Sequence, residues 1–385
     1  MIKNTLILLL FLSFAFTSKA QTDKKITGDS LKIKGQLSVW THYNANNNLE
    51  WWNGGRYIPQ LNYEIKNQSD KMLDFEASAN IYGNFGTVPF DTINSSRKIK
   101  PYRLWTRYSG EQFEIRLGLQ KINFGSASLL RPLMWFDQMD PRDPLQLTDG
   151  VWGALGRYYF LNNANIWLWT LYGTEKLKGW EMFPTKNKTP EFGGRIQAPV
   201  PKGEAAISYH HRNVDISVLS SRWKKYFYTP ENRLAVDARF DLVVGCWLEA
   251  SWINKQENIR RQTNLEIINI GADYTFGIGN GLSLIFEQLI FAADEEAFEF
   301  KNTATFSLLN LGYPIGLFDN LSAIVYYDWA NNKTYNFLNW QRQYNKFTFL
   351  VMAYMNPKDY NIPTQLTEEN LFAGNGIQFM IVFNH

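Results

Sequence analysis

Two sets of charged side chains in this sequence are spaced so that together they could act on a polar solute. The first set is five arginines at polar positions of short extended segments, namely Arg103, Arg107, Arg116, Arg157 and Arg195. The second set lies in the long link between two of these segments and consists of Asp137, Asp140 and Asp143. An acidic link facing a basic wall would create a transverse electric field, which orders water and favours polar solutes.

Two other interpretations of the link aspartates stay open. Asp140 and Asp143 each precede a proline, so they can instead form turns and ion pairs that hold the link in place. A metal site is the weaker interpretation, because hard cations need about six to eight oxygen ligands. Three carboxylates at this spacing, two of them directly followed by a proline, define no such loop. We therefore predict neither a metal nor a cofactor.

Patterns typical of catalysis are sparse. The nearest pairing of a nucleophile with a base is Ser208 with His210 or His211, and neither an orienting acid nor a nucleophile elbow accompanies it. Cys246 is the single cysteine, which excludes an internal disulfide and a cysteine cluster for a metal. The sequence therefore predicts a protein that is not an enzyme.

The segments that carry the arginines alternate apolar and polar residues, as strands with two different faces do. Residues 72–83, 112–120 and 233–241 are the clearest examples. A soluble sandwich and a membrane barrel both give this pattern, but only the barrel explains why short turns alternate with long links. The long links are 84–100, 123–150, 174–190 and 212–231. The fold class predicted is all-β, a single transmembrane antiparallel β-barrel with short periplasmic turns and long extracellular loops.

The expected number of strands is eighteen. Seventeen segments are read as strands, and because bacterial barrels have an even number of strands, residues 333–342 are taken as one more. A barrel of sixteen strands is the alternative. The predicted strands are 32–43, 57–66, 72–83, 101–109, 112–122, 151–160, 165–173, 191–198, 203–211, 232–241, 244–254, 264–276, 281–291, 302–312, 320–330, 333–342, 346–355 and 374–383.

The beginning of the chain predicts export. Lys3, an apolar run over residues 5–16 and the small residues Ser18 and Ala20 are typical of a secretory signal peptide over residues 1–20. Residues 21–31 are expected to be a polar periplasmic tail, and residues 32–385 the outer-membrane barrel. Without the signal peptide, 37 basic and 36 acidic residues remain, and this balance argues against a nucleic-acid partner.

One motif resembles a known family. Residues 116–125 read R-L-G-L-Q-K-I-N-F-G, and D-P-R-D-P follows over residues 140–144. This resembles Gram-negative porin-like and export barrels of the alginate-export type, and the closing residues 380–385 are similar to uncharacterised outer-membrane barrels of the Bacteroidota. The resemblance implies a passive channel of 16 or 18 strands with a loop folded into the lumen. The sequence departs from the family at Leu119, where a basic residue is often found.

Two functions are compatible with such a barrel. The first is a porin-like channel for passive diffusion of small hydrophilic solutes, surrounded by outer-membrane lipid and lipopolysaccharide. The second is a structural or accessory subunit of a larger outer-membrane secretion or assembly complex. Trp51, Trp52 and residues 226–228 would then offer an apolar patch to a partner. A continuous polar path favours the channel, whereas a plugged lumen favours the accessory subunit.

Overall fold

The structure, a computed structural model, describes residues 29–46, 49–66, 71–87, 93–137, 139, 143–174, 176–219, 227–358 and 372–385. The predicted signal peptide and residues 21–28 of the predicted tail lie outside this part. β1 begins at Asp29, so residues 29–31 belong to a strand instead of the tail. Among the described residues, no helix is long and apolar enough to cross a membrane.

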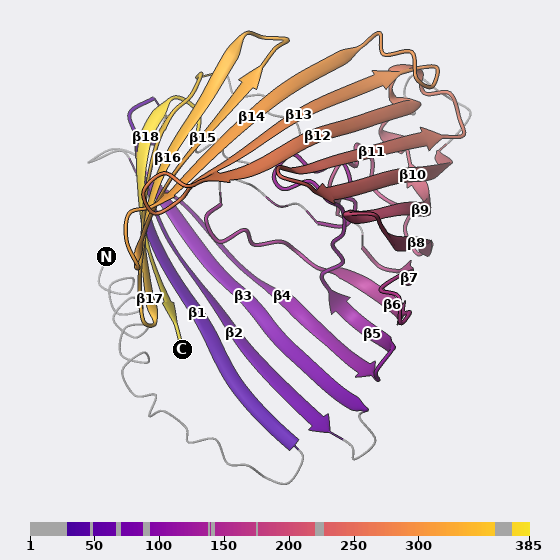
Figure 1. Ribbon diagram of the computed structural model, residues 1–385, viewed down its shortest axis with the longest axis horizontal. Coiled ribbons are helices and arrows are strands. Elements are labelled where there is room, and N and C mark those ends of the chain that lie inside the picture. The colour runs from indigo at the N-terminus through magenta and orange to yellow at the C-terminus, as the bar shows by residue number, and fades with distance from the viewer. Residues whose placement is uncertain are drawn as a thin grey trace.

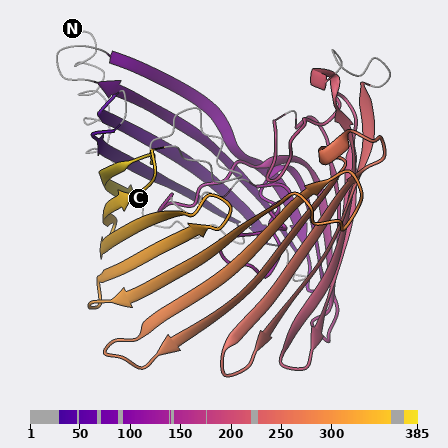
Figure 2. The same cartoon turned by 90° about the horizontal axis from the view of Figure 1, so that it is seen from above.

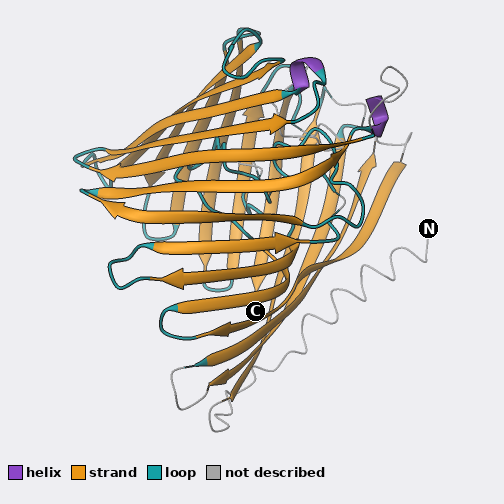
Figure 3. Ribbon diagram, turned by 90° about the vertical axis from the view of Figure 1, so that its right-hand side faces the viewer, coloured by secondary structure: helices purple, strands orange, loops and turns teal. Residues whose placement is uncertain are grey.

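The described residues form eighteen strands and two short 3-10 helices. The strands are β1 (Asp29–Asn44), β2 (Trp51–Lys66), β3 (Met72–Thr87), β4 (Ile93–Ser109), β5 (Phe113–Gln120), β6 (Val151–Tyr159), β7 (Asn165–Leu171), β8 (Glu191–Val200), β9 (Gly203–Asp215), β10 (Tyr228–Asp241), β11 (Gly245–Lys255), β12 (Asn264–Phe276), β13 (Leu282–Asp294), β14 (Thr303–Pro314), β15 (Asp319–Asp328), β16 (Lys333–Tyr344), β17 (Phe347–Met355) and β18 (Asn375–Asn384). The helices, η1 (Ser217–Leu219) and η2 (Arg260–Gln262), lie at one end of the barrel (Figure 3).

Pairing of the first strand with the last closes the barrel. Each strand pairs antiparallel with its neighbours in the sequence, and β1 also pairs with β18 (Figure 1). The prediction of eighteen strands is therefore confirmed, and the alternative of sixteen is wrong. Because the sheet closes on itself, it has no first or last edge strand along which its backbone would be left without partners.

The wall has an apolar outer face and a polar inner face. On β9, the outward side chains of Ile207 and Tyr209 are 58% and 42% exposed, whereas Ser208 and His210 between them are fully buried. This alternation is the one expected of a barrel in lipid, where apolar side chains face the hydrocarbon and polar side chains face the lumen.

Two of the predicted long links are shorter than expected. The link predicted at 84–100 is wrong, since β3 runs to Thr87 and β4 begins at Ile93. Likewise β9 runs to Asp215 and β10 begins at Tyr228, which shortens the link predicted at 212–231. The physical reason is that polar residues here still pair through their backbones, without the apolar face that marks a strand in a sequence.

The wall is uneven in height. β5, β6 and β7 contain 8, 9 and 7 residues, whereas β4 contains 17 (Figure 1). Two long segments leave from this low sector, and we call them inner loop A (residues 121–150) and inner loop B (residues 172–190). Their traces lie between the purple strands of one side of the barrel and the orange strands of the other (Figure 2). The lumen is therefore partly filled by its own chain.

Candidate solute path and the inner loops

A buried carboxylate on the wall opposite β5 holds inner loop A. The carboxylate of Glu287, on β13, accepts hydrogen bonds from the backbone N–H groups of Ser128, Leu129 and Leu130 at 2.6, 3.1 and 2.5 Å. Glu287 is fully buried, and hydrogen bonds to a charged group are stronger than those between neutral groups. Inner loop A therefore crosses the lumen and is fixed on its far side.

A second buried carboxylate lies beside the first. Glu249, on β11, accepts hydrogen bonds from the backbone N–H groups of Ala127 and Leu133 at 2.9 and 3.2 Å. The indole Nε1 of Trp135 also donates to the Ser251 hydroxyl on β11 at 3.1 Å. The sequence analysis missed Glu249 and Glu287, because their partners are backbone groups more than a hundred residues away and leave no pattern in the sequence.

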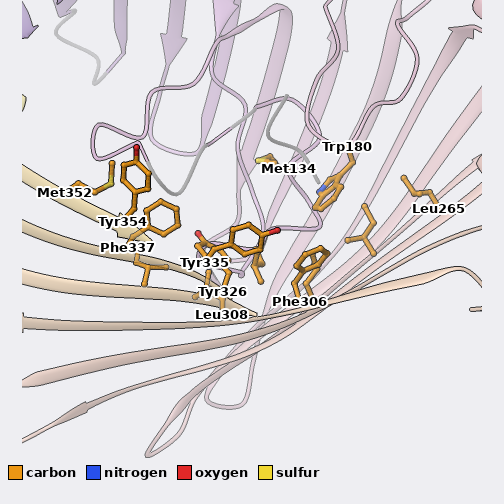
Figure 4. Close-up of a cluster of buried hydrophobic side chains, with 14 of the residues drawn as sticks. Met134, Trp180, Leu265, Phe306, Leu308, Tyr326, Tyr335, Phe337, Met352 and Tyr354 are labelled. Atoms are coloured by element: carbon orange, nitrogen blue, oxygen red, sulfur yellow. The ribbon is translucent and has the colours of Figure 1, made fainter. Parts of the chain in front are cut away.

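Apolar packing fills the space between the inner loops and the far wall. Leu130 and Met134 of inner loop A and Trp180 of inner loop B belong to one buried cluster with side chains of the wall (Figure 4). The wall members are Ile253, Leu265, Ile267, Leu289, Phe306, Leu308, Ile324, Tyr326, Tyr335, Phe337, Met352 and Tyr354. This burial confines the polar part of the lumen to the opposite side, which carries the arginines.

Three of the predicted arginines surround one carboxylate. Glu114 lies 3.5, 3.0 and 3.5 Å from nitrogens of Arg107, Arg116 and Arg157, and Arg107 also pairs with Asp74 at 2.5 Å. Among these five side chains, three guanidinium groups outnumber the two carboxylates by one positive charge. The arginine side chains are 25%, 15% and 16% exposed, so water reaches them. We call these five residues the arginine cluster.

Two tryptophans support the arginine cluster. The guanidinium of Arg157 lies over the Trp167 ring, 3.7 Å from its centroid, and that of Arg116 lies over the Trp105 ring at 4.8 Å. Cation–π contacts of this kind hold a guanidinium in place without neutralising its charge. The cations of the arginine cluster are therefore held in fixed positions on the lumen side of β4, β5 and β6.

The other two predicted arginines hold inner loop A. Arg103 donates from Nη2 to the backbone carbonyl of Thr148 at 3.0 Å. Arg195 pairs with Asp237 at 2.5 Å, and the same carboxylate accepts a hydrogen bond from the Ser126 hydroxyl at 3.2 Å. Both arginines are buried, so they act on a solute only through the position of the loop.

The predicted loop aspartates have local partners. Asp137 is buried and pairs with Arg131 of the same loop at 3.0 Å. Asp143 accepts the backbone N–H of Leu145 at 2.9 Å, which is a turn of the kind that an aspartate before proline forms. Asp140 lies outside the described residues. Among the described ion pairs, the predicted arginines Arg107, Arg116, Arg157 and Arg195 are matched by carboxylates of the wall, and Asp137 is matched within inner loop A.

A buried ionic network that the sequence analysis did not assemble holds inner loop B. Glu181 of this loop lies 3.3 Å from Arg212 on β9 and 2.8 Å from Arg233 on β10, and both arginines also contact Glu231. Lys178 adds a contact to Glu181 at 3.3 Å. The available signal was the alternation of charges along 203–215 and 228–241, which places these residues on the inner face of the wall.

The pairing of serine with histidine does not form a catalytic set. The Nε2 atom of His210 lies 3.0 Å from Glu191, and its Nδ1 accepts a hydrogen bond from the indole of Trp169 at 3.1 Å. The Ser208 hydroxyl instead accepts a hydrogen bond from Arg195 at 3.0 Å. Both ring nitrogens of His210 are therefore occupied by structural partners.

Comparisons with known proteins agree with this architecture. No protein-family model matches the sequence, and the search of curated proteins finds no match either. Among solved structures, Acinetobacter baumannii OccAB4 is similar with a TM-score of 0.56 and 11% identity, over 94% of this chain and 99% of that one. Pseudomonas aeruginosa OccK7 (OpdD) also has a TM-score of 0.56, with 10% identity over 94% and 99% of the two chains. The fold is that of an outer-membrane porin.

At this level of identity the likeness concerns the fold. The shared fold agrees with the closed antiparallel wall described above.

Proposed function

We propose that this protein is a channel of the Gram-negative outer membrane through which small hydrophilic solutes diffuse passively. The observation that carries the proposal is the partly exposed arginine cluster, which lies inside a closed barrel whose outer face is apolar. A purely structural barrel has no need for three cations around one carboxylate at the surface of its lumen. The same location implies a wall surrounded by membrane lipid and a chain that works as a channel rather than as an enzyme.

Within this proposal the predicted constriction residues have two tasks. Arg107, Arg116 and Arg157 face the solute path and favour anionic and strongly polar solutes. Arg103 and Arg195, together with the aspartates Asp137 and Asp143, set the shape and position of inner loop A. The loop in turn sets the width of the path.

The proposals for export and for the relation to known barrel families rest on the sequence. The signal peptide over residues 1–20 supports export to the outer membrane, where lipopolysaccharide forms the outer leaflet. The motif over residues 116–125 supports a relation to alginate-export barrels, and residues 380–385 support a relation to barrels of the Bacteroidota.

Swelling of proteoliposomes tests the proposal. Vesicles that contain the folded protein should swell in isotonic solutions of small sugars and of small organic anions, with a rate that falls as solute size increases. Arg116→Gln should slow the entry of anions relative to that of neutral sugars of similar size. Arg342→Gln, on the outer face near a turn, should not change this ratio. Vesicles with folded protein that swell no faster than empty vesicles would contradict the proposal.

The accessory-subunit alternative rests on apolar groups at the loop ends of strands. Trp52 is buried, but Trp51, Phe227 and Tyr228 are exposed, and Tyr226 lies outside the described residues. A stable co-purifying outer-membrane partner that is lost on Trp51→Ala together with Phe227→Ala would support this alternative.

A further inference from the structure

The first half of β4 has a neighbouring strand on one side only. β4 pairs with β3 from Ile93 to Ser109, whereas it pairs with β5 only from Leu104 to Ser109 (Figure 1). Among the described residues, none forms a backbone hydrogen bond with residues 94–99 on the side away from β3. A strand edge of this kind presents a row of backbone N–H and C=O groups to which another strand can pair. We call residues 94–99 the open edge.

Inner loop A covers β4 only below the open edge. Arg103 donates to the backbone carbonyl of Thr148, and Lys100 pairs with Asp149. Residues 94–99 are all exposed, although successive residues of a strand point to opposite faces of the sheet. The open edge is therefore uncovered on both faces as well as along its side.

The open edge lies outside the hydrocarbon layer of the membrane. Lys100 faces inner loop A, so Lys98 shares the inward face of β4 and Arg97 points outward. In hydrocarbon, a charged side chain on the outward face and a backbone group without a partner are both costly. The open edge therefore stands in water at the end of the barrel that carries the long loops, where another polypeptide can reach it.

The charge of the open edge is positive and is not balanced by the sheet around it. Arg97, Lys98 and Lys100 lie within four consecutive positions, and residues 93–103 contain no acidic residue. The residues of β3 that pair with this part of β4, 80–87, contain no acidic residue either. Among the described ion pairs, Lys100 has a carboxylate partner, whereas Arg97 and Lys98 have none. Both therefore remain available to carboxylates of a partner.

We propose that the open edge binds an acidic segment of a partner protein, which adds to β4 as an extra antiparallel strand. Backbone hydrogen bonds supply affinity in this mode of recognition, and carboxylates opposite Arg97 and Lys98 supply specificity. Like charges directly opposite each other destabilise a strand pair, so the same two residues disfavour pairing with a second copy of this chain. The open edge is separate from the arginine cluster, and binding there is independent of conduction.

Fluorescence anisotropy of a labelled peptide with the purified protein in detergent tests the proposal. The probe has the sequence E-V-E-E-T-T-V, which places glutamates opposite Lys100, Lys98 and Arg97 in an antiparallel pairing. One control peptide, K-V-K-K-T-T-V, reverses the charge, and the other is the acidic peptide with every backbone nitrogen methylated, which keeps the charge but removes the backbone donors. We expect the acidic peptide to bind at least about tenfold more tightly than either control.

Two results with these peptides would overturn the proposal. Equal binding of the acidic peptide and its methylated form would show that the open edge is a general surface for anions and does not add a strand. An acidic peptide that does not bind at concentrations up to about 1 mM would show that the edge accepts no such partner.

Variants locate the binding on the open edge. Arg97→Glu and Lys98→Glu should each weaken binding of the acidic peptide by about five- to tenfold, because a cross-strand pair of opposite charges is replaced by repulsion. The peptide E-V-E-K-T-T-V, with lysine opposite position 97, should bind Arg97→Glu more tightly than the parent protein. Lys301→Glu is the control, since Lys301 is an exposed basic residue in the link between β13 and β14, and it should bind the acidic peptide like the parent. Equal binding by Arg97→Glu, Lys98→Glu and the parent would overturn the proposal. Heat-modifiable migration in gels confirms that every variant is folded.

Discussion

A Cβ atom on Gly125 would lie 2.0 Å from Oε1 of Glu249, so only glycine lets inner loop A approach this carboxylate. Gly125 also has a φ of 110°, a backbone conformation that side chains disfavour. The loop and the carboxylate are thus matched: the backbone closes around Glu249, and Glu249 satisfies two backbone N–H groups that would otherwise be buried without partners. The width of the path depends on this contact.

Replacement of Gly125 should release inner loop A. Gly125→Ala combines a positive φ with a steric clash, so we expect a cost of about 2–4 kcal/mol in the free energy of unfolding. Limited proteolysis and urea unfolding in detergent measure the effect. Gly277→Ala is the matched control, because a Cβ there meets nothing within 4 Å. Equal resistance of the two variants to protease and urea would contradict this account of the loop.

Glu287 gives a second way to loosen the same loop. Glu287→Gln keeps the shape of the side chain but replaces one acceptor oxygen by an NH₂ group that faces backbone donors. The loss of charge-assisted hydrogen bonds should cost about 1.5–3 kcal/mol and should raise the single-channel conductance together with its noise. Glu296→Gln, in the exposed link between β13 and β14, should leave both quantities unchanged. If Glu287→Gln has the same single-channel conductance and the same current noise as the parent protein, another contact holds the loop.

Glu114 should control the selectivity of the arginine cluster. Glu114→Gln removes the carboxylate that three guanidinium groups share, so the excess positive charge at the lumen surface rises. We expect a stronger preference for anions in reversal-potential measurements, and we expect the change to shrink at high salt because screening increases. An unchanged reversal potential at low salt would place the cluster away from the path.

The ionic network around inner loop B should be more important for stability than the charges near the turns. Arg233→Met leaves Glu181 and Glu231 buried with fewer cationic partners, for which we expect a loss of about 3–5 kcal/mol. Arg239→Met is the control, since its partner Asp273 is partly exposed and such pairs contribute about 0–1 kcal/mol. Urea unfolding in detergent compares the two variants, and similar midpoints would contradict the assigned role of the network.

The sequence predicted the wall better than the contents of the lumen. Lipid on one side and water on the other force residues to alternate along a strand. Seventeen of the eighteen strands were predicted from their residue pattern, and β16 was predicted from the even number of strands in bacterial barrels. The extension of β3 and β4 into 84–100 was missed because these ends are mostly polar and contain only isolated apolar residues such as Phe85 and Ile99. The family resemblance implied a loop folded into the lumen, and in the link at 123–150 the apolar residues Leu130, Leu133, Met134, Trp135 and Phe136 are buried.

The motif at residues 116–125 could be recognised in the sequence, but the contacts that its residues make could not be predicted from it. Gly118 has a φ of 117°, and a Cβ there would lie 2.2 Å from the carbonyl oxygen of Leu104. The side-chain amide of Gln120 donates to the backbone carbonyl of Gly153 at 3.1 Å, and Phe124 packs in the lumen beside Trp135. These residues end a strand and turn the chain inward. The contacts depend on distant strands, so residue spacing alone does not reveal them.

Single-channel conductance of the purified protein in a planar bilayer is the most direct test of the central claim. We predict stable open steps with a preference for anions in two salts that differ in the size of cation and anion, and a larger step for Glu287→Gln than for the parent protein. Folded protein that inserts without any conductance, in both the parent and the loop variant, would contradict the claim that this barrel is a channel narrowed by inner loop A.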